Sequence, residues 1–258
     1  SYTIDIYQHK MKPTYDMVAF FAFISFFPQL VAGPIERATN LLPQFLKVRT
    51  FDYGQAVDGM QQILYGLFKK MVIADNCSRL VDIVFSNYQQ LGSIQLFLGA
   101  VFFTFQIYCD FSGYSDMAIG IARILGIHLP DNFNIPYLAF NVTEFWKRWH
   151  MSLSSWLRDY LYIPLGGNRK GALRTYFNLI ATMLLGGLWH GAAWTYVIWG
   201  GLHGIALAFN KIWSLKVSPL NNTFTKIVSV VVTFHFVTLC WIFFRAESFS
   251  KALLISGS

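Results

Sequence analysis

Apolar residues along this chain gather in long runs separated by polar segments. Because about 30 Å of hydrocarbon requires about 20 residues at about 1.5 Å per residue, uncharged runs near that length are candidate membrane spans. Residues 17–32 are apolar but include Pro28 and Gln29, which favours a kinked end packed inside protein. The next segment, 33–58, is polar and is predicted to be a loop. The clearest predicted spans are 176–189, 192–209 and 227–244.

Two other apolar runs contain polar residues. In 57–84 the apolar positions recur at helical spacing around Lys69 and Lys70, which favours an amphipathic or partly buried helix. The runs 94–108 and 117–127 flank the polar sequence CDFSGYSD, so this span is either broken or unusually polar inside. The polar residues of this insert are Asp110, Ser112, Ser115 and Asp116. They could cap a break between half-helices, the interpretation we favour, or could orient a histidine or line a channel.

Residues 141–163 are predicted to form one amphipathic helix on the membrane surface. Its aromatic and aliphatic stripe comprises Trp146, Trp149, Leu153, Trp156, Leu157 and Tyr160. Residues 147–174 also carry the strongest cationic cluster of the chain: Lys147, Arg148, Arg158, Arg169, Lys170 and Arg174. By the positive-inside rule this region is cytoplasmic. His190 then lies about 24 Å along the next helix, towards the opposite membrane face.

Composition agrees with an all-α, multi-pass membrane protein. The 258 residues are 55% hydrophobic and 18% aromatic but only 13% charged, which is outside the range of soluble domains. The formal charge is +7, and the Lys and Arg residues lie between apolar segments. This placement indicates a role in membrane topology and in contacts with lipid headgroups rather than nucleic-acid binding. The three cysteines support neither a disulfide framework nor a metal site. Since the chain opens at Ser1 within apparently internal sequence, we expect a central fragment.

His190, in LLGGLWHGAAW, is the strongest candidate for chemistry, because an ionisable group at membrane depth is a functional hypothesis by default. On a continuous helix it would share a face with Gly186, Gly187 and Trp194. A neutral imidazole could accept a proton from a hydroxyl that attacks a carbonyl, which fits acyl transfer. The alternative, a hydrogen bond to a neighbouring helix across a glycine contact, carries equal weight.

The other histidines offer weaker signals. His150 lies within the predicted surface helix and by itself is best explained as a headgroup contact. His203 is interpreted as a structural helix contact, because thirteen residues from His190 it cannot share its helical face. The sequence lacks a phosphate-binding loop, a G-x-S-x-G elbow and an H-E-x-x-H pair. Direct attack of an acceptor on an acyl donor is therefore simpler than an acyl-enzyme.

Five sequence blocks together resemble the membrane-bound O-acyltransferase family, and most closely its alginate O-acetyltransferase branch. They are FPQLVAGPIER (27–37), YGLFKKMVIADN (65–76), QIYCDFSGYSDMAIGIARILGI (106–127), FWKRWHMSLSSWLRDYLYIPLGGNRKG (145–171) and LLGGLWHGAAW (184–194). The resemblance implies a single transmembrane helical domain over 1–258 with surface helices, incomplete at both ends. It implies that His190 is the catalytic histidine and His150 the second motif histidine.

The resemblance further implies a tunnel between a cytoplasmic acyl donor and an acceptor hydroxyl on the far side. Trp189 and Trp194 would wall it, and Asp110, Ser112 and Asp116 would support it by hydrogen bonds. Arg148 and Trp149 would line the donor path beside His150, which would shape its donor end. The donor would be a substrate, acyl-CoA or a carrier-linked acyl group, and no bound cofactor is expected.

The activity implied is transfer of an acyl group, most plausibly acetyl, to hydroxyls of an exported or cell-envelope polysaccharide such as alginate. The location implied is the bacterial cytoplasmic membrane, with accessory polysaccharide-modification proteins as candidate partners. D-alanyl transfer to teichoic acid and acetylation of peptidoglycan are alternatives within the same family. A transporter or channel is a distant alternative, for which the sequence contains no inverted repeat.

Overall fold

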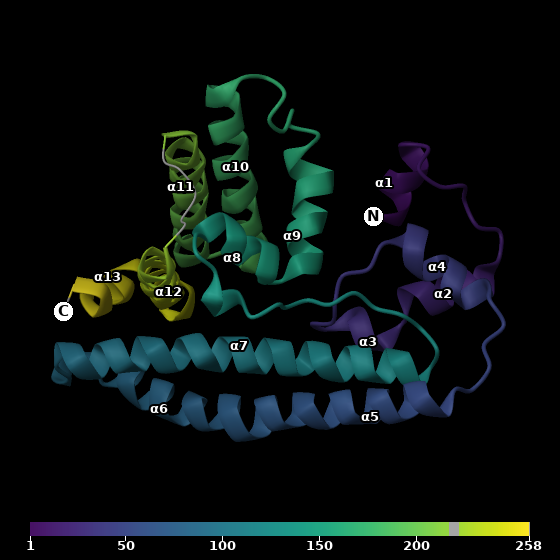
Figure 1. Cartoon of the computed structure of the whole chain (residues 1–258), viewed down its shortest axis with the longest axis horizontal. Helices are drawn as coiled ribbons and strands as arrows, with labels where there is room; N and C mark the ends of the chain where they lie inside the picture. The colour runs from purple at the N-terminus through teal and green to yellow at the C-terminus, as the bar shows by residue number, and fades with distance from the viewer. Residues whose placement is uncertain (217–221, 258) are drawn as a thin grey trace. The chain divides into compact units, whose positions relative to one another are not determined.

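The computed structural model describes residues 1–216 and 222–257, which are helical with no strand in those ranges (Figure 1). Backbone contacts gather in two units: Ser1–Asp75 with Ile107–Asn132, and Asn76–Gln106 with Phe133–Ser258. The long helix α7 (Ser93–Ile124) contributes to both. The prediction of one domain over 1–258 stays a prediction.

The first unit begins with short helices and ends with two long ones. Its helices are α1 (Tyr2–Tyr7), α2 (Met17–Ile24), α3 (Phe27–Leu30), α4 (Ala38–Leu46), α5 (Tyr53–Leu67) and the π-helix η1 (Phe68–Ala74). The predicted kink in 17–32 is confirmed, because α2 ends before Pro28 and α3 restarts there. The predicted loop 33–58 is wrong in part, since α4 buries Ala38, Leu41 and Leu42 at helical spacing and α5 starts inside that range.

Within this unit α5 lies along the 107–124 part of α7 (Figure 1). The two backbones approach closely because glycine faces glycine, and a Cβ on Gly113 would lie 2.7 Å from the carbonyl oxygen of Gly66. Gly113 is therefore a packing residue inside an unbroken 32-residue helix. The preferred prediction of a capped break at CDFSGYSD is wrong, and the alternative of a helix with a polar interior is correct.

The second unit holds most of the chain. Its elements are α6 (Asp75–Ser86, from Asn76), η2 (Tyr88–Gln90), the first part of α7, η3 (Pro136–Leu138), α8 (Val142–Arg148), α9 (Met151–Leu157), η4 (Arg158–Tyr162), α10 (Ala172–His190), α11 (Trp194–Lys216), α12 (Thr223–Arg245) and α13 (Phe249–Gly257). The three predicted later spans correspond to α10, α11 and α12. Among the described helices, α7 and α12 have the length and hydropathy needed to cross a membrane.

Helices α10 and α11 form a tight hairpin (Figure 1). A Cβ on Gly187 of α10 would lie 3.4 Å from Cα of Gly200 on α11 and closer still to the carbonyl oxygen of Tyr196. Only glycine permits this approach, which brings side chains of α11 to the end of α10.

Candidate functional site

His190 is the last residue of α10, and its half-buried ring lies where the α10–α11 hairpin turns. The following residue, Gly191, is extended (φ 167°, ψ 156°), and a new helix begins at Trp194. The predicted shared face of His190 and Trp194 is therefore wrong, because the helix that would have joined them ends between them. A side chain at a helix end has more open space beside it than one in mid-helix.

Aromatic rings from three helices surround His190. Its ring centroid lies 5.3 Å from Trp199 of α11 and 5.3 Å from Phe244 of α12. Trp189 contacts it at 5.0 Å, although 62% of Trp189 is exposed. Trp194 is 78% exposed at the start of α11. The tunnel-wall role predicted for both tryptophans stays a prediction. The rings that contact His190 from other helices are Trp199, Tyr196 and Phe244.

His150 occupies a break in what the sequence predicted as one surface helix. Its backbone is in the left-handed region (φ 44°), so α8 ends at Arg148 and α9 starts at Met151. A non-glycine residue there is strained by about 1 kcal/mol or more, and such strain often occurs at functional sites. Asn134 N donates to the carbonyl oxygen of Arg148 (2.9 Å), which helps to hold the break. The prediction of a continuous helix over 141–163 is wrong.

The break turns His150 inward, since only 5% of the residue is exposed. The headgroup interpretation of His150 is therefore wrong for this structure. Burial and, to a smaller extent, the charge of a protonated His190 lower its pKa from 6.5 to about 3. The two histidines, forty residues apart in sequence, thus lie within electrostatic reach of each other.

A continuous set of buried rings links the surroundings of the two histidines. Trp149, beside His150, contacts Trp241 of α12 at 5.0 Å, and Trp241 stacks on Trp199 at 5.6 Å. Trp199 also contacts His203 at 5.2 Å. Sequence analysis missed Trp199, Trp241 and Phe244 and interpreted His203 only as a structural helix contact. The signal available was the four-residue spacing of Trp199 and His203, which puts both on one helical face.

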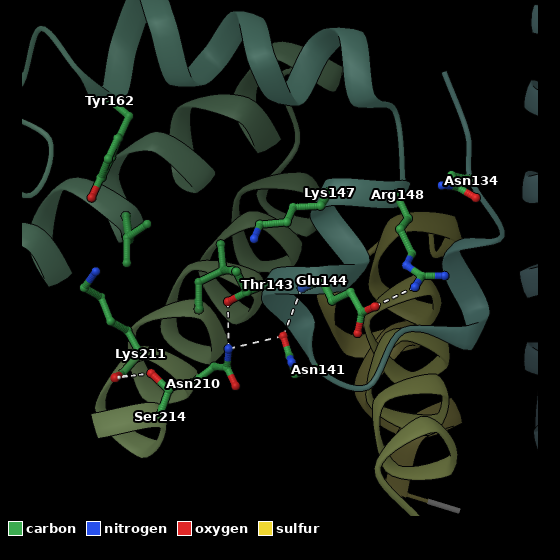
Figure 2. Close-up of a pocket in the computed structure, with 12 residues that line it drawn as sticks. Asn134, Asn141, Thr143, Glu144, Lys147, Arg148, Tyr162, Asn210, Lys211 and Ser214 are labelled. Atoms are coloured by element: carbon green, nitrogen blue, oxygen red, sulfur yellow. Dashed lines mark hydrogen bonds and ion pairs between the residues drawn. The ribbon is translucent and has the colours of Figure 1, made fainter. Parts of the chain in front are cut away.

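A cavity of about 770 Å³ opens between α8, α10 and α11 (Figure 2). Asn210 of α11 donates to Thr143 Oγ1 (2.7 Å) and to Asn141 Oδ1 (3.3 Å), and Figure 2 shows these bonds joining α11 to α8. The lining residues are Asn134, Asn141, Thr143, Glu144, Lys147, Arg148, Tyr162, Leu179, Leu207, Asn210, Lys211 and Ser214. The cavity is therefore polar and cationic.

Arg148 neutralises the one carboxylate of this cavity, because its Nη2 lies 2.6 Å from Glu144 Oε1. Glu144 also accepts from the backbone N–H of Phe140 (2.8 Å), and Asn141 caps α8 by accepting from Glu144 N (2.9 Å). Lys147 and Lys211 have no carboxylate within 4.0 Å among the described residues. Two positive charges thus remain available to an anionic ligand.

A smaller apolar cavity of about 250 Å³ continues from the first one. The two share Tyr162, Leu179 and Leu207 in their linings. The smaller cavity also contacts Trp146, whose indole N–H donates to His203 Nδ1 (3.2 Å) and whose ring lies 5.8 Å from Trp199. The cationic cavity therefore adjoins an apolar one that is lined by Trp146, a ring in contact with the aromatic cluster.

The two carboxylates of α7 have partners of their own in the first unit. Asp116 pairs with Lys69 at 2.7 Å, and Asp110 pairs with Lys70 at 2.6 Å. Ser112 is 2% exposed, and its hydroxyl has no hydrogen-bond partner in the described chain. The predicted support of the tunnel by these residues stays a prediction, while the contacts observed for the carboxylates are ion pairs with lysine.

A sequence profile described as MBOAT, membrane-bound O-acyltransferase family, matches residues 6–249. The chain is 47% identical over 235 residues to a peptidoglycan O-acetyltransferase of Helicobacter pylori, covering 90% of this chain and 45% of that protein. It is 45% identical over 254 residues to a probable alginate O-acetylase, AlgI, of Pseudomonas aeruginosa, covering 98% and 48%.

A more distant relative is a teichoic acid D-alanyltransferase of Bacillus subtilis, 32% identical over 245 residues, covering 88% of this chain and 61% of that protein. The chain spans about half the length of the O-acetyltransferase relatives that it matches. The match runs across both units of the structure.

Proposed function

Because the chain belongs to the membrane-bound O-acyltransferase family, we propose that it is the central part of an enzyme that acylates a cell-envelope or exported polysaccharide. The acyl group is acetyl, and the acceptor is a polymer hydroxyl. The observation that carries this proposal is a histidine at a helix end, enclosed by rings, within electrostatic reach of a second buried histidine. Its location is the bacterial cytoplasmic membrane.

His190 acts as the general base. A neutral imidazole accepts the proton of the acceptor hydroxyl while its oxygen attacks the acyl carbonyl carbon. The carbonyl π electrons move to oxygen, and the tetrahedral intermediate collapses with loss of the donor's leaving group, which takes up the proton from His190. Attack is direct, so no acyl-enzyme forms. The apolar rings around His190 favour its neutral form and exclude water that would hydrolyse the donor.

The donor carries phosphate groups and is acyl-CoA or a carrier-linked phosphopantetheine thioester. The support is the pair of unmatched lysines, Lys147 and Lys211, at the cationic cavity and the apolar cavity that continues from it. Phosphate oxygens would meet the lysines, and the thioester arm would pass Trp146 towards the aromatic cluster. His150 shapes the donor end of this path.

Acetylation of peptidoglycan is the second candidate, favoured by the 47% identity to the Helicobacter pylori protein. D-alanylation of teichoic acid is the third, with the lower identity of 32% to its relative. All three reactions need a base for a hydroxyl, so His190 would serve each. Accessory polysaccharide-modification proteins would deliver the polymer on the outer side of the membrane.

The test compares ester content in cells that carry the full-length parent protein and cells that carry its His190→Ala variant. We expect at least a 1,000-fold lower rate of ester formation, in the range of losses seen when a catalytic base is removed. His235→Ala is the matched control, because His235 is an exposed histidine of α12 that stacks on Phe97. Membrane abundance of the three proteins must be equal.

Exported polysaccharide, peptidoglycan and teichoic acid are analysed in parallel, so that the ester lost identifies the acceptor. Unchanged esters in all three polymers with His190→Ala would overturn the role of His190. Solute uptake into vesicles that contain the protein but no acyl donor would instead support a transporter.

A further inference from the structure

Three buried N–H groups beside His190 lack hydrogen-bond acceptors. They are Nε1 of Trp199, Nε1 of Trp241 and Nε2 of His203, on residues that are 2%, 1% and 0% exposed. In the described chain, every other buried side-chain atom without a hydrogen-bond partner is an oxygen. The unpartnered buried nitrogens therefore occur in a single cluster.

The contact between Trp146 and His203 determines which nitrogen of His203 carries the proton. An indole nitrogen can only donate, so Trp146 Nε1–H, at 3.2 Å, requires Nδ1 of His203 to be the acceptor. The proton of the neutral ring is then on Nε2, the atom without a partner. A doubly protonated ring would lose the bond from Trp146, so this contact keeps His203 a neutral donor.

The three donors lie in rings that are linked through Trp199, and Trp199 also contacts His190. Trp199 is common to all of them, with centroid distances of 5.6 Å to Trp241, 5.2 Å to His203 and 5.3 Å to His190. Buried donors without acceptors are unfavourable, and native proteins keep them chiefly where a ligand, a water or a reaction supplies the acceptor. A set that only donates requires an oxygen ligand with negative or partly negative charge.

We propose that Trp199, Trp241 and His203 form a binding site for the carbonyl oxygen of the acyl group, which rests on the proposed acyl transfer. When the acceptor oxygen attacks the carbonyl carbon, the π electron pair moves to the carbonyl oxygen. The proton of the acceptor hydroxyl goes to His190. The N–H groups stabilise the resulting oxyanion. When the carbonyl re-forms, the donor's sulfur leaves with its bonding pair and takes the proton from His190. Such donors are most effective where water is excluded.

The test uses the full-length parent protein, purified, with acetyl-CoA as donor and the polymer that the wild-type protein acylates as acceptor. In Trp199→Phe and Trp241→Phe the aromatic ring remains and the N–H is lost. We expect kcat to fall by about 10- to 100-fold with KM for both substrates within about twofold, because the bond strengthens only as the oxygen gains charge.

Trp213→Phe is the matched control, because Trp213 is a 55% exposed tryptophan farther along α11 that stacks on Phe209. Its kcat should equal that of the wild-type protein. If a phenylalanine variant does not fold, benzothienylalanine at the same position replaces the N–H by sulfur and keeps the bicyclic shape. A thermal melt of each variant separates a catalytic loss from a loss of folded protein.

Two substitutions of His203 separate its two nitrogens. A glutamine amide can reach the position of Nε2 and an asparagine amide that of Nδ1, so His203→Gln should retain more kcat than His203→Asn. The opposite order would mean that His203 serves only to hold Trp146. Unchanged kcat in both Trp→Phe variants, or a lower melting temperature with unchanged kcat per folded molecule, would overturn the proposal and indicate a structural water.

Failure of this proposal is distinguishable from failure of the proposed function. A wild-type protein that acylates none of the three polymers, with either class of donor, contradicts the proposed function itself. An active wild-type protein with fully active Trp199→Phe and Trp241→Phe variants contradicts only the oxyanion site.

Discussion

In the first unit Lys69 and Lys70 are each paired with carboxylates, whereas in the second unit Lys147 and Lys211 have no such partner among the described residues. Lys69 lies 2.7 Å from Asp116, and Lys70 lies 2.6 Å from Asp110 and 2.7 Å from Asp75. Adjacent lysines reach α7 from η1, a π-helix in which the turn is wider than in an α-helix. The lysines that face α7 are thus paired within the chain, whereas the two lysines of the cavity are open to a ligand.

The buried aromatic N–H groups of the second unit also contrast with these ion pairs. The aromatic cluster contains three buried N–H groups without an acceptor, while the lysines of η1 are compensated by carboxylates of α7. A group whose partner belongs to the chain itself stabilises the fold, and a group whose partner is absent is available to a ligand. This distinction predicts that substitutions in the first unit change stability and that substitutions in the second change kinetics.

The largest stability effect is expected at Asp116. Asp116→Leu leaves the half-buried ammonium of Lys69 without its partner, and we expect the free energy of unfolding to fall by about 3 kcal/mol. Thermal unfolding of the full-length protein in detergent measures this change. The double variant Lys69→Met with Asp116→Leu should recover most of the loss, because an apolar pair replaces the ion pair.

The exposed pair Asp82–Arg245 is the control for this experiment. Its carboxylate is 57% exposed, so Asp82→Ala should cost less than about 1 kcal/mol. An Asp116→Leu variant as stable as Asp82→Ala would show that the pair in the first unit is not structural, and the contrast between the units would fail.

A smaller effect is expected when the unmatched lysines are removed. Lys147→Ala and Lys211→Ala should each raise KM for the acyl donor by about 5- to 10-fold, equivalent to about 1 kcal/mol, and leave melting temperature and kcat nearly unchanged. Lys226→Ala is the control, because Lys226 is exposed at the start of α12 and does not line the cavity. The effect on KM should weaken at high salt. An unchanged KM in both lysine variants would contradict a phosphate-bearing donor.

An effect of similar size concerns the pH dependence of stability at His150. Its pKa is about 3 in the folded protein and 6.5 in the unfolded chain, so below pH 6.5 the unfolded chain binds a proton that the folded protein does not. The free energy of unfolding should therefore fall with decreasing pH, by about 1.4 kcal/mol at pH 5.5.

Melting curves between pH 7.5 and 5.5 test this prediction. The His150→Gln variant should show a flatter profile, whereas His235→Gln, at an exposed position, should keep the wild-type slope. Identical slopes for wild type and His150→Gln would mean that His150 is solvated in the folded protein. The contrast between the two units would then be weaker.

Much of the helical order was predictable, because apolar run lengths and helical periodicity are local properties. The spans 176–189, 192–209 and 227–244 fall within α10, α11 and α12. The errors occurred where packing overrides local signals. The sequence around Gly113 predicts a break, yet α7 continues through it. Gly113 instead permits the close approach of α7 to Gly66 on α5.

The site was predictable in part. His190 stands out in the sequence, since ionisable residues in apolar surroundings are rare. His150 became a candidate through the family motif that surrounds it. The break at His150 could not be foreseen from the stripe of 141–163, because a left-handed residue depends on contacts such as Asn134 with Arg148. Likewise, His203 joins the cluster only because the hairpin folds α11 back onto α10.

By itself the sequence determined that this is an all-helical membrane protein, where the later helices α10, α11 and α12 lie, and that His190 is a candidate for chemistry. Composition and periodicity suffice for these conclusions, because they depend on each segment and its solvent. Only the tertiary structure decided which carboxylates are paired, which N–H groups are left open and which rings enclose His190. The ion pairs of Asp110 and Asp116, the stack of Trp199 on Trp241 and the contact of Phe244 with His190 join residues forty or more positions apart. Local patterns in the sequence do not specify such contacts.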